Sequence, residues 1–249
     1  MLRCLVLLIC IVTLAACSTD SAIDASAATQ TEVETFVPSE VTASDIPSDI
    51  QEDSWARLPR VTREALDSDG QRVFDVIVNP DSRYATGLRG PIGMWMYSPR
   101  VAEHLFPVST YLRYGTDGTR DQRLTELAIL TAARALDSQY EWSAHEPLGR
   151  NAGLEEEIIE LLRHDRPIPT DDTVPGLRET ELSIIRVTRE LIDEPKLSAE
   201  AFAAAQRIFG NEGLMDLVGL IGHYTTVNYT LKTFDVQRPP GSQLTLPLP

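Results

Sequence analysis

Two neighbouring stretches decide the fold and the candidate site: Glu126-Leu-Ala-Ile-Leu-Thr-Ala-Ala-Arg134 and Tyr140-Glu-Trp-Ser-Ala-His145. In and around the first stretch, apolar residues recur at intervals of three and four, which is the repeat of one helix face. In the second stretch, Glu141 and His145 are four positions apart. On a helix this spacing places both side chains on one face, one turn from each other. The two stretches therefore predict helices that carry a carboxylate–imidazole pair.

The same apolar spacing continues from Arg57 onward, where strand-like alternation is scarce. We therefore expect an all-α fold. The expected helices cover residues 68–78, a segment entered at Ser98-Pro99, a segment capped by Thr119, and residues 140–152, 154–163, 178–193, 198–209 and 213–234. Residues 87–93 are rich in glycine and are expected to form a loop. The last helix is apolar over most of its surface, which predicts a central buried helix.

The N-terminal residues have the pattern of a secretion signal. Arg3 precedes a dozen almost entirely apolar residues, a run too short to span a bilayer. This run ends in Leu14-Ala-Ala-Cys17, which resembles the lipobox of bacterial lipoproteins. The resemblance implies that residues 1–16 are a cleaved signal peptide and that Cys17 carries the lipid, including palmitate-type acyl chains. Ser18 follows the cysteine, which implies an outer-membrane protein facing the periplasm.

Residues 17–56 differ in composition from the rest of the chain. Between Ser18 and Ala56 there are nine acidic residues and no Lys or Arg. Such a segment buries little apolar surface, so we expect a disordered acidic tether. Residues 57–249 are expected to form one helical domain. The formal net charge of −15 argues against nucleic acid as a partner, because phosphate binding needs a basic face.

The phrase from Tyr140 to His145, followed by Gly149-Arg-Asn-Ala-Gly-Leu154, resembles the carboxymuconolactone decarboxylase family, which includes the alkylhydroperoxidase D type. The resemblance implies an alkylhydroperoxidase D-like helical bundle with two related helical halves, the second being residues 180–235. It also implies homo-oligomers, commonly trimers or multiples of them, with the site near a subunit boundary.

The redox members of this family place a glutamate, two cysteines and a histidine at fixed spacing. The corresponding residues here are Glu126, Ser138, Glu141 and His145, so both cysteines are replaced. All three cysteines of the chain, Cys4, Cys10 and Cys17, lie in the signal region. Thiol peroxidase chemistry needs an attacking thiolate and a resolving thiol. We therefore expect no thiol peroxidase activity from this domain.

Without the cysteines, the family positions still hold two carboxylates and an imidazole, which are suited to proton transfer. We expect His145, Glu126 and Glu141 to be catalytic, with Arg134 and Tyr140 binding substrate. Histidine transfers protons near neutral pH, and arginine can hold a carboxylate. Alternatives stay open for these residues: Glu141 and His145 as a surface pair, and Arg134 as an ion-pair partner. His223, Tyr224 and Asn228 share one helix, and we interpret them as polar groups of the core.

The sequence and the resemblance together predict an acid–base enzyme that acts without a cofactor on a small carboxylated molecule, for example by decarboxylating a lactone or keto acid. Carboxylates and an imidazole can also bind Zn²⁺ or Fe²⁺, but we expect no metal. The alternative function is a non-catalytic helical module, held at the membrane by the lipid anchor, that binds a ligand or a partner.

Overall fold

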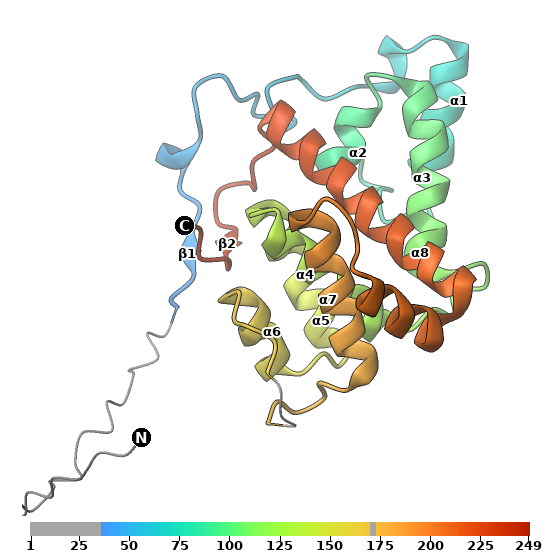
Figure 1. The fold of residues 1–249 in the computed structure, drawn as a ribbon. Helices are drawn as coiled ribbons and strands as arrows, with labels where there is room; N and C mark the ends of the chain where they lie inside the picture. Colours follow the sequence, from blue (N-terminus) through green and yellow to red (C-terminus); the bar gives the residue numbers. More distant parts are fainter. Residues whose placement is uncertain (1–35, 170–172) are drawn as a thin grey trace, which may run out of the picture. The chain divides into compact units, whose positions relative to one another are not determined.

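The computed structural model describes residues 36–169 and 173–249; the predicted signal peptide and Cys17 lie outside these residues. The described part is all-α, as the sequence predicts (Figure 1). Its helices are α1 (Ser68–Ile77), α2 (Gly90–Trp95), α3 (Pro99–Tyr114), α4 (Gln122–Ala135), α5 (Gln139–Asn151), α6 (Glu156–Arg163), α7 (Glu179–Asp193) and α8 (Ala199–Phe234). Two short strands, β1 (Ser39–Glu40) and β2 (Gln243–Leu244), pair antiparallel.

Helix α4 is the central helix of the bundle. It packs against α5, α7 and α8, and every residue from Thr125 to Ala133 is buried. Its N-cap is Asp121, whose carboxylate accepts a hydrogen bond from the Leu124 amide, so the predicted cap at Thr119 is wrong. The expectation that the last helix would be the central one is also wrong, because α8 leaves one side exposed.

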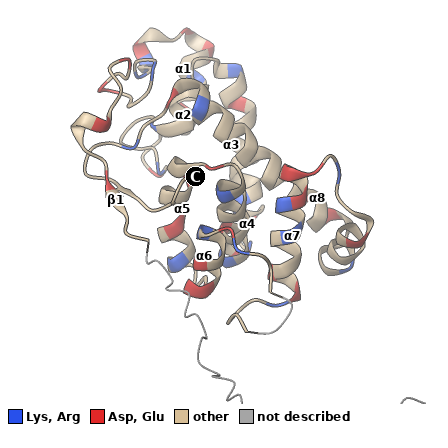
Figure 2. Cartoon of the chain, turned by 60° about the vertical axis from the view of Figure 1, so that its left-hand side comes forward, with Lys and Arg blue, Asp and Glu red and all other residues tan. Residues whose placement is uncertain are grey.

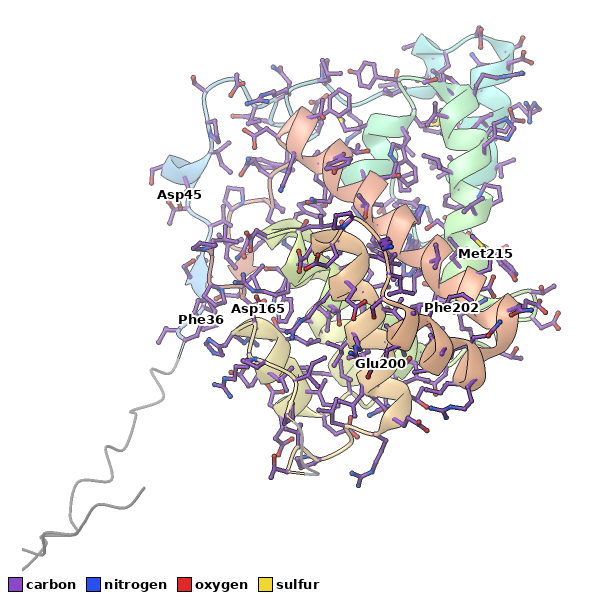
Figure 3. All side chains as sticks on the ribbon, viewed as in Figure 1. Phe36, Asp45, Asp165, Glu200, Phe202 and Met215 are labelled. Atoms are coloured by element: carbon purple, nitrogen blue, oxygen red, sulfur yellow. The ribbon has the colours of Figure 1, made fainter. Side chains whose placement is uncertain are left out.

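Helix α8 joins two groups of helices. One of its faces contacts α2 and α3, and it also packs on α4 and α7 (Figure 1). Met215 and Phe202 on α8 are exposed to solvent (Figure 3). The helix is interrupted at Gly210, whose φ of 67° is left-handed and accessible to glycine without strain. This interruption is the predicted division between residues 198–209 and 213–234.

The structure also corrects the expected loop at residues 87–93 and the expected tether in residues 36–56. Residues 90–95 form a short helix, α2, rather than part of a loop; Pro91 in its first turn is compatible with a helix start. Residues 36–56 are not a disordered tether, since Val41, Ile50 and Ala56 are buried and β1 pairs with β2. The ordered domain therefore begins before residue 57. The pairing of β1 with β2 joins segments that are far apart in the sequence, so local composition could not predict it.

Charge and hydropathy over the described residues are unexceptional. Acidic and basic positions are interspersed over the helices in the view of Figure 2. Within residues 36–169 and 173–249, no helix is both long enough and apolar enough to cross a bilayer. Any anionic ligand must therefore be recognised by a local group of cations rather than by the charge of the whole molecule.

Candidate functional site

His145 is bonded on both ring nitrogens by carboxylates from two helices. Its Nδ1 atom lies 2.6 Å from Oε2 of Glu126, which α4 carries. Its Nε2 atom lies 3.3 Å from Oε2 of Glu141, one turn earlier on α5. All three side chains are buried. The structure therefore brings together the three residues that the sequence predicts as catalytic.

Arg113 of α3 contacts the other oxygen of the Glu126 carboxylate, so that Arg113, Glu126, His145 and Glu141 form a buried row of charges. Its Nη2 atom donates to Oε1 of Glu126 over 3.1 Å, and both side chains are only 3 % exposed. The carboxylate of Glu126 is thus held from both ends, by a guanidinium and by an imidazole. Such charge-assisted bonds are stronger than neutral ones, and they fix the orientation of the ring. The sequence analysis did not predict Arg113.

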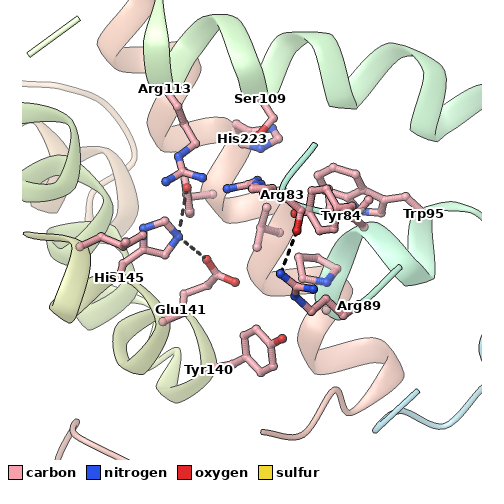
Figure 4. A pocket seen from close by; sticks show the side chains of 17 residues that line it. Arg83, Tyr84, Arg89, Trp95, Ser109, Arg113, Tyr140, Glu141, His145 and His223 are labelled. Atoms are coloured by element: carbon pink, nitrogen blue, oxygen red, sulfur yellow. Dashed lines mark hydrogen bonds and ion pairs between the residues drawn. The ribbon is translucent and has the colours of Figure 1, made fainter. Parts of the chain in front are cut away.

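The face of His145 opposite Glu126 borders a cavity of about 180 Å³ (Figure 4). We call this cavity the His145 pocket. It lies between α2, α3, α5 and α8 and the loop before α2. Its walls include Arg83, Tyr84, Arg89, Gly90, Trp95, Ser109, Arg113, Tyr140, Glu141, His145, His223 and Tyr224. The volume is below the 300 Å³ or so at which drug-sized ligand sites begin, which limits the occupant to a small molecule.

The charges around His145 determine its protonation. Burial by itself lowers the pKa of an imidazole, but the bonds to Glu126 and Glu141 outweigh it and raise the pKa of His145 above its ordinary value. Burial would raise the pKa of Glu126, yet the His145 and Arg113 contacts lower it. The favoured state is therefore an imidazolium between two carboxylates. In this state His145 is a proton donor that faces the pocket through Nε2.

Two residues of α8 form the wall opposite α5. The Tyr224 hydroxyl oxygen lies 3.2 Å from Nε2 of His145, and burial raises the pKa of this hydroxyl well above its ordinary value. Burial lowers the pKa of His223 to about 4, so this imidazole is neutral at pH 7. Its buried Nδ1 atom has no hydrogen-bond partner among the described residues. Both residues are buried polar groups, as the sequence analysis interprets them, and they also line the pocket.

The pocket carries an excess of positive charge. Arg83 and Arg89 line it together with Arg113 (Figure 4). Arg83 lies over the Tyr84 ring at 5.0 Å, and Arg89 donates to a hydroxyl and to a backbone carbonyl. These contacts are with neutral groups, so both charges can interact with a ligand. Glu126 and Glu141 pair with Arg113 and the imidazolium, so Arg83 and Arg89 supply the excess of positive charge, and this favours an anionic ligand.

Tyr140, which the sequence analysis assigns to substrate binding, lies in the pocket wall. Burial and the nearby Glu141 charge raise the pKa of its hydroxyl to about 12, so this group is a neutral donor. Gly90 lines the same pocket and lies close to the Tyr140 hydroxyl. A Cβ atom on Gly90 would lie 2.8 Å from the Tyr140 hydroxyl oxygen, and φ at this glycine is +60°. The close approach of α2 to α5 therefore requires glycine at position 90.

Arg134 is not in this pocket, which corrects its predicted role in substrate binding. Its Nη1 atom pairs with Asp137 at 2.9 Å and donates to the Pro247 carbonyl at 3.1 Å. Arg134 follows Glu126 by eight positions, which is a rotation of about 80° around a helix with 3.6 residues per turn. The two side chains consequently point in different directions, and Arg134 holds the C-terminal tail.

One family model matches part of the chain. Residues 99–174, which include α3 to α6, match the model of the carboxymuconolactone decarboxylase family. This part of the chain is similar to that family. The carboxymuconolactone decarboxylase region supplies Arg113, Glu126, Glu141 and His145 to the site. The residues before and after it supply Arg83, Arg89, His223 and Tyr224.

Two solved structures are similar in fold. One is an uncharacterised peroxidase-related protein from Ralstonia eutropha JMP134, described as an alkylhydroperoxidase AhpD core. It is 14 % identical over 74 % of this chain and 92 % of its own, with a TM-score of 0.56. The other is a protein of unknown function from Agrobacterium tumefaciens, named for the antioxidant defence protein AhpD. It is 20 % identical over 60 % of this chain and 98 % of its own, with a TM-score of 0.48. No curated protein matches the chain in sequence.

The carboxymuconolactone decarboxylase region of this chain contains no cysteine. Ser138 is the N-cap residue of α5, and Glu141 lies in the first turn. Neither side chain can form a thiolate or a disulfide. Within residues 36–169 and 173–249, no three His, Cys, Asp or Glu side chains are grouped so as to hold a metal ion. The imidazole of His145 and the carboxylates of Glu126 and Glu141 are groups that can transfer protons.

Proposed function

We propose that this protein is an acid–base enzyme that acts without a cofactor on a small carboxylated molecule. The observation that carries the proposal is the position of His145. Its ring is held as an imidazolium by Glu126 and Glu141, and its Nε2 atom borders a small pocket lined by three arginines. A protonated base beside an anion-binding surface is what protonation of a carbanion requires.

Decarboxylation is the reaction that best uses this arrangement. Arg83 and Arg89 hold the substrate in the pocket by its negative charge. The bond between the carboxyl carbon and its neighbour breaks, CO₂ leaves, and the electron pair stays on the substrate as an enolate. His145 then gives its Nε2 proton to carbon and becomes neutral, and a proton from water restores the imidazolium. The substrate must therefore carry a group that delocalises the electron pair, as an unsaturated lactone or a β-keto acid does.

Glu126 and Glu141 have different parts in this proposal. Glu126 binds Nδ1 and does not line the pocket, so it is a positioning residue that fixes the ring and its charge. Glu141 lines the pocket and pairs with the nitrogen that delivers the proton. Its carboxylate stabilises the imidazolium before the transfer and can direct the returning proton. Tyr224 supplies a neutral hydroxyl at the same nitrogen.

A screen for CO₂ release tests the proposal. The full chain is incubated with small lactones that carry a carboxylate, with β-keto acids, and with their methyl esters as matched uncharged controls. Catalysed CO₂ release from an acid, with product containing one solvent deuterium in D₂O, is the expected result. Binding of these acids with no turnover by any of them would support the ligand-binding module instead. Turnover of organic hydroperoxides by a variant without cysteines would contradict the acid–base account.

We also propose that the domain is held at the membrane by a lipid on Cys17. The support is the sequence of residues 1–17, because Cys17 lies outside the described residues. Assembly into trimers stays a prediction, which light scattering on the purified protein decides. A site close to a subunit boundary predicts that monomers at micromolar concentration lose activity.

A further inference from the structure

A second cavity lies beside the His145 pocket and shares Tyr140 with it as a wall. Its volume is about 390 Å³. The first residues of α5 and the last two turns of α8 form one side. Val41, next to β1, and the C-terminal tail around Leu244 form the other. We call it the Asn228 pocket.

Asn228 is the unusual feature of this cavity. This residue is only 1 % exposed and lines the cavity. Neither Oδ1 nor Nδ2 of its side chain has a hydrogen-bond partner among the described residues. A buried amide without partners costs about 1–3 kcal/mol. The neighbouring polar residues of α8 avoid this cost: Thr226 and Thr230 donate to backbone carbonyls of their own helix. An unsatisfied amide on a cavity wall indicates a polar ligand.

Two further side chains of the same wall also have buried polar atoms without hydrogen-bond partners. Oε1 of Gln139 and Nε of Arg238 are buried atoms without a hydrogen-bond partner among residues 36–169 and 173–249. Both residues line the cavity, and Arg238 lies over the Tyr140 ring at 5.6 Å. Three residues of this wall, from three segments of the chain, thus carry buried polar atoms that lack partners. Buried atoms without partners also occur elsewhere in the described residues, but this cavity is lined by three residues that carry them.

The charge and the walls of the cavity define what it can hold. Lys232 and Arg238 are the cations, and Asp45, Asp137 and Asp235 are the acids, so there is no excess of positive charge for a carboxylate. Asn228 offers one acceptor and one donor side by side, which match the donor and the acceptor of another amide. The apolar residues of the wall, Val41, Leu231, Val236, Leu244 and Leu248, suit a hydrocarbon body.

We propose that the Asn228 pocket binds a small organic molecule with a neutral carboxamide group and an apolar body. The amide of the ligand pairs with Asn228, and its hydrocarbon part packs against the tail. The site uses none of Glu126, Glu141 or His145, so it stands whether or not the His145 pocket is catalytic. Asn228, Arg238 and the residues around Val41 and Leu244 lie outside the region 99–174, so most of the pocket is not supplied by the family region.

The tail that closes this pocket is firmly attached. β2 pairs with β1, and the Val41 amide donates to the Ser242 carbonyl over 2.8 Å. Arg163 donates to the Thr245 carbonyl, and the Thr245 amide donates to Ser143 over 3.1 Å. Arg134, the residue first assigned to substrate, holds the carbonyl of Pro247. The wall is therefore preorganised, which lowers the entropic cost of binding.

Calorimetric titration of the full chain with three matched probes tests the proposal. The probes are hexanamide, hexanoate and 1-hexanol, which share a chain and differ in the polar group. Hexanamide is expected to bind at least ten-fold more tightly than either of the others. Asn228→Leu is expected to weaken hexanamide binding at least ten-fold. It should fold, since it removes an unpaired amide; the control Asn211→Leu changes an exposed residue of the same helix.

A second measurement does not depend on a variant. In the parent protein, the NMR signals of the Asn228 side-chain NH₂ group should shift as hexanamide is added. Equal binding of hexanamide and 1-hexanol, or hexanamide binding that Asn228→Leu leaves unchanged, would overturn the proposal. So would binding that His145→Gln abolishes and Asn228→Leu does not, because the ligand would then occupy the His145 pocket. Absence of any binding or shift at millimolar hexanamide also overturns it.

Discussion

The Nδ1 atom of His145 lies 2.6 Å from the carboxylate of Glu126, although the two residues are on different helices. The same carboxylate holds Arg113, so one buried acid connects α3, α4 and α5. This acid therefore has two consequences: it fixes the ring that faces the pocket, and it joins three helices through charges that are removed from water.

Replacing Glu126 by Gln should destabilise the protein by about 3–5 kcal/mol, because Arg113 and His145 would then be buried cations without their acid. Urea unfolding at pH 7 measures the loss. Glu157→Gln, on an exposed position of α6, is the control and should change stability by less than about 0.5 kcal/mol. Equal effects of the two substitutions would show that the buried row of charges contributes nothing to folding.

His223 should make the protein less stable in acid. Its pKa is about 4 in the folded protein and 6.5 when unfolded, so the unfolded chain binds more protons between these values. The contribution is complete above about pH 6.5 and is lost as the pH falls through 4, by about 3 kcal/mol in all. His223→Gln should reduce the stability difference between pH 7 and pH 4 accordingly. His104→Gln changes an exposed histidine and is the control, whose stability should depend on pH as that of the parent does. If the stability of His223→Gln depended on pH as steeply as that of the parent and of the control, this would contradict the burial of a neutral imidazole.

Gly90→Ala tests the contact between α2 and α5. Alanine at a left-handed φ costs about 1–2 kcal/mol, and here its Cβ would also lie 2.8 Å from the Tyr140 hydroxyl. Gly118→Ala has a similar φ, +70°, but no atom within 4 Å of the added Cβ, so it measures the backbone cost alone. Thermal unfolding should show a larger loss for Gly90→Ala. Equal losses would mean that Tyr140 moves freely and does not form a fixed pocket wall.

Cys17→Ala should abolish lipid attachment. Cells that express each variant are grown with radioactive palmitate, and the label on the purified protein is counted. The parent and Cys10→Ala should both carry label, since Cys10 lies within the apolar run rather than at its end. Equal labelling of Cys17→Ala and the parent would contradict lipid attachment at Cys17, and absence of label from both would indicate an ordinary secretion signal.

The sequence predicted the helices and the three central site residues for clear reasons. Helix periodicity is local, and the spacing of Glu141 and His145 follows from one turn of helix. The role of Glu126 depended on a resemblance to a family, because its distance from His145 is set by the packing of α4 on α5. The N-cap of α4 is Asp121 and not Thr119. Which of two nearby residues caps a helix depends on backbone geometry, which the sequence does not give directly.

The remaining part of the site depends on long-range contacts. Arg83 and Arg113 come from segments before α4, and His223 and Tyr224 come from a helix far along the chain. A signal for the last two was present: His223, Tyr224 and Asn228 are polar residues close together on an apolar helix. The structure shows that these residues are buried and that they also line two cavities. The apolar residues around Val41 were too few for local composition to predict that this segment is ordered.

Turnover by His145→Gln across the pH range tests the central claim most directly. With an acid identified by CO₂ release, the parent should be active at low pH and should lose activity as the pH rises through the elevated pKa of His145. Glu141→Gln should shift this loss to lower pH, because it removes a charge that stabilises the imidazolium. His145→Gln should reduce turnover by about 10²–10⁴-fold and abolish this pH dependence while the protein stays folded. Turnover by His145→Gln within a few-fold of the parent, with the same pH profile, would contradict proton transfer by His145.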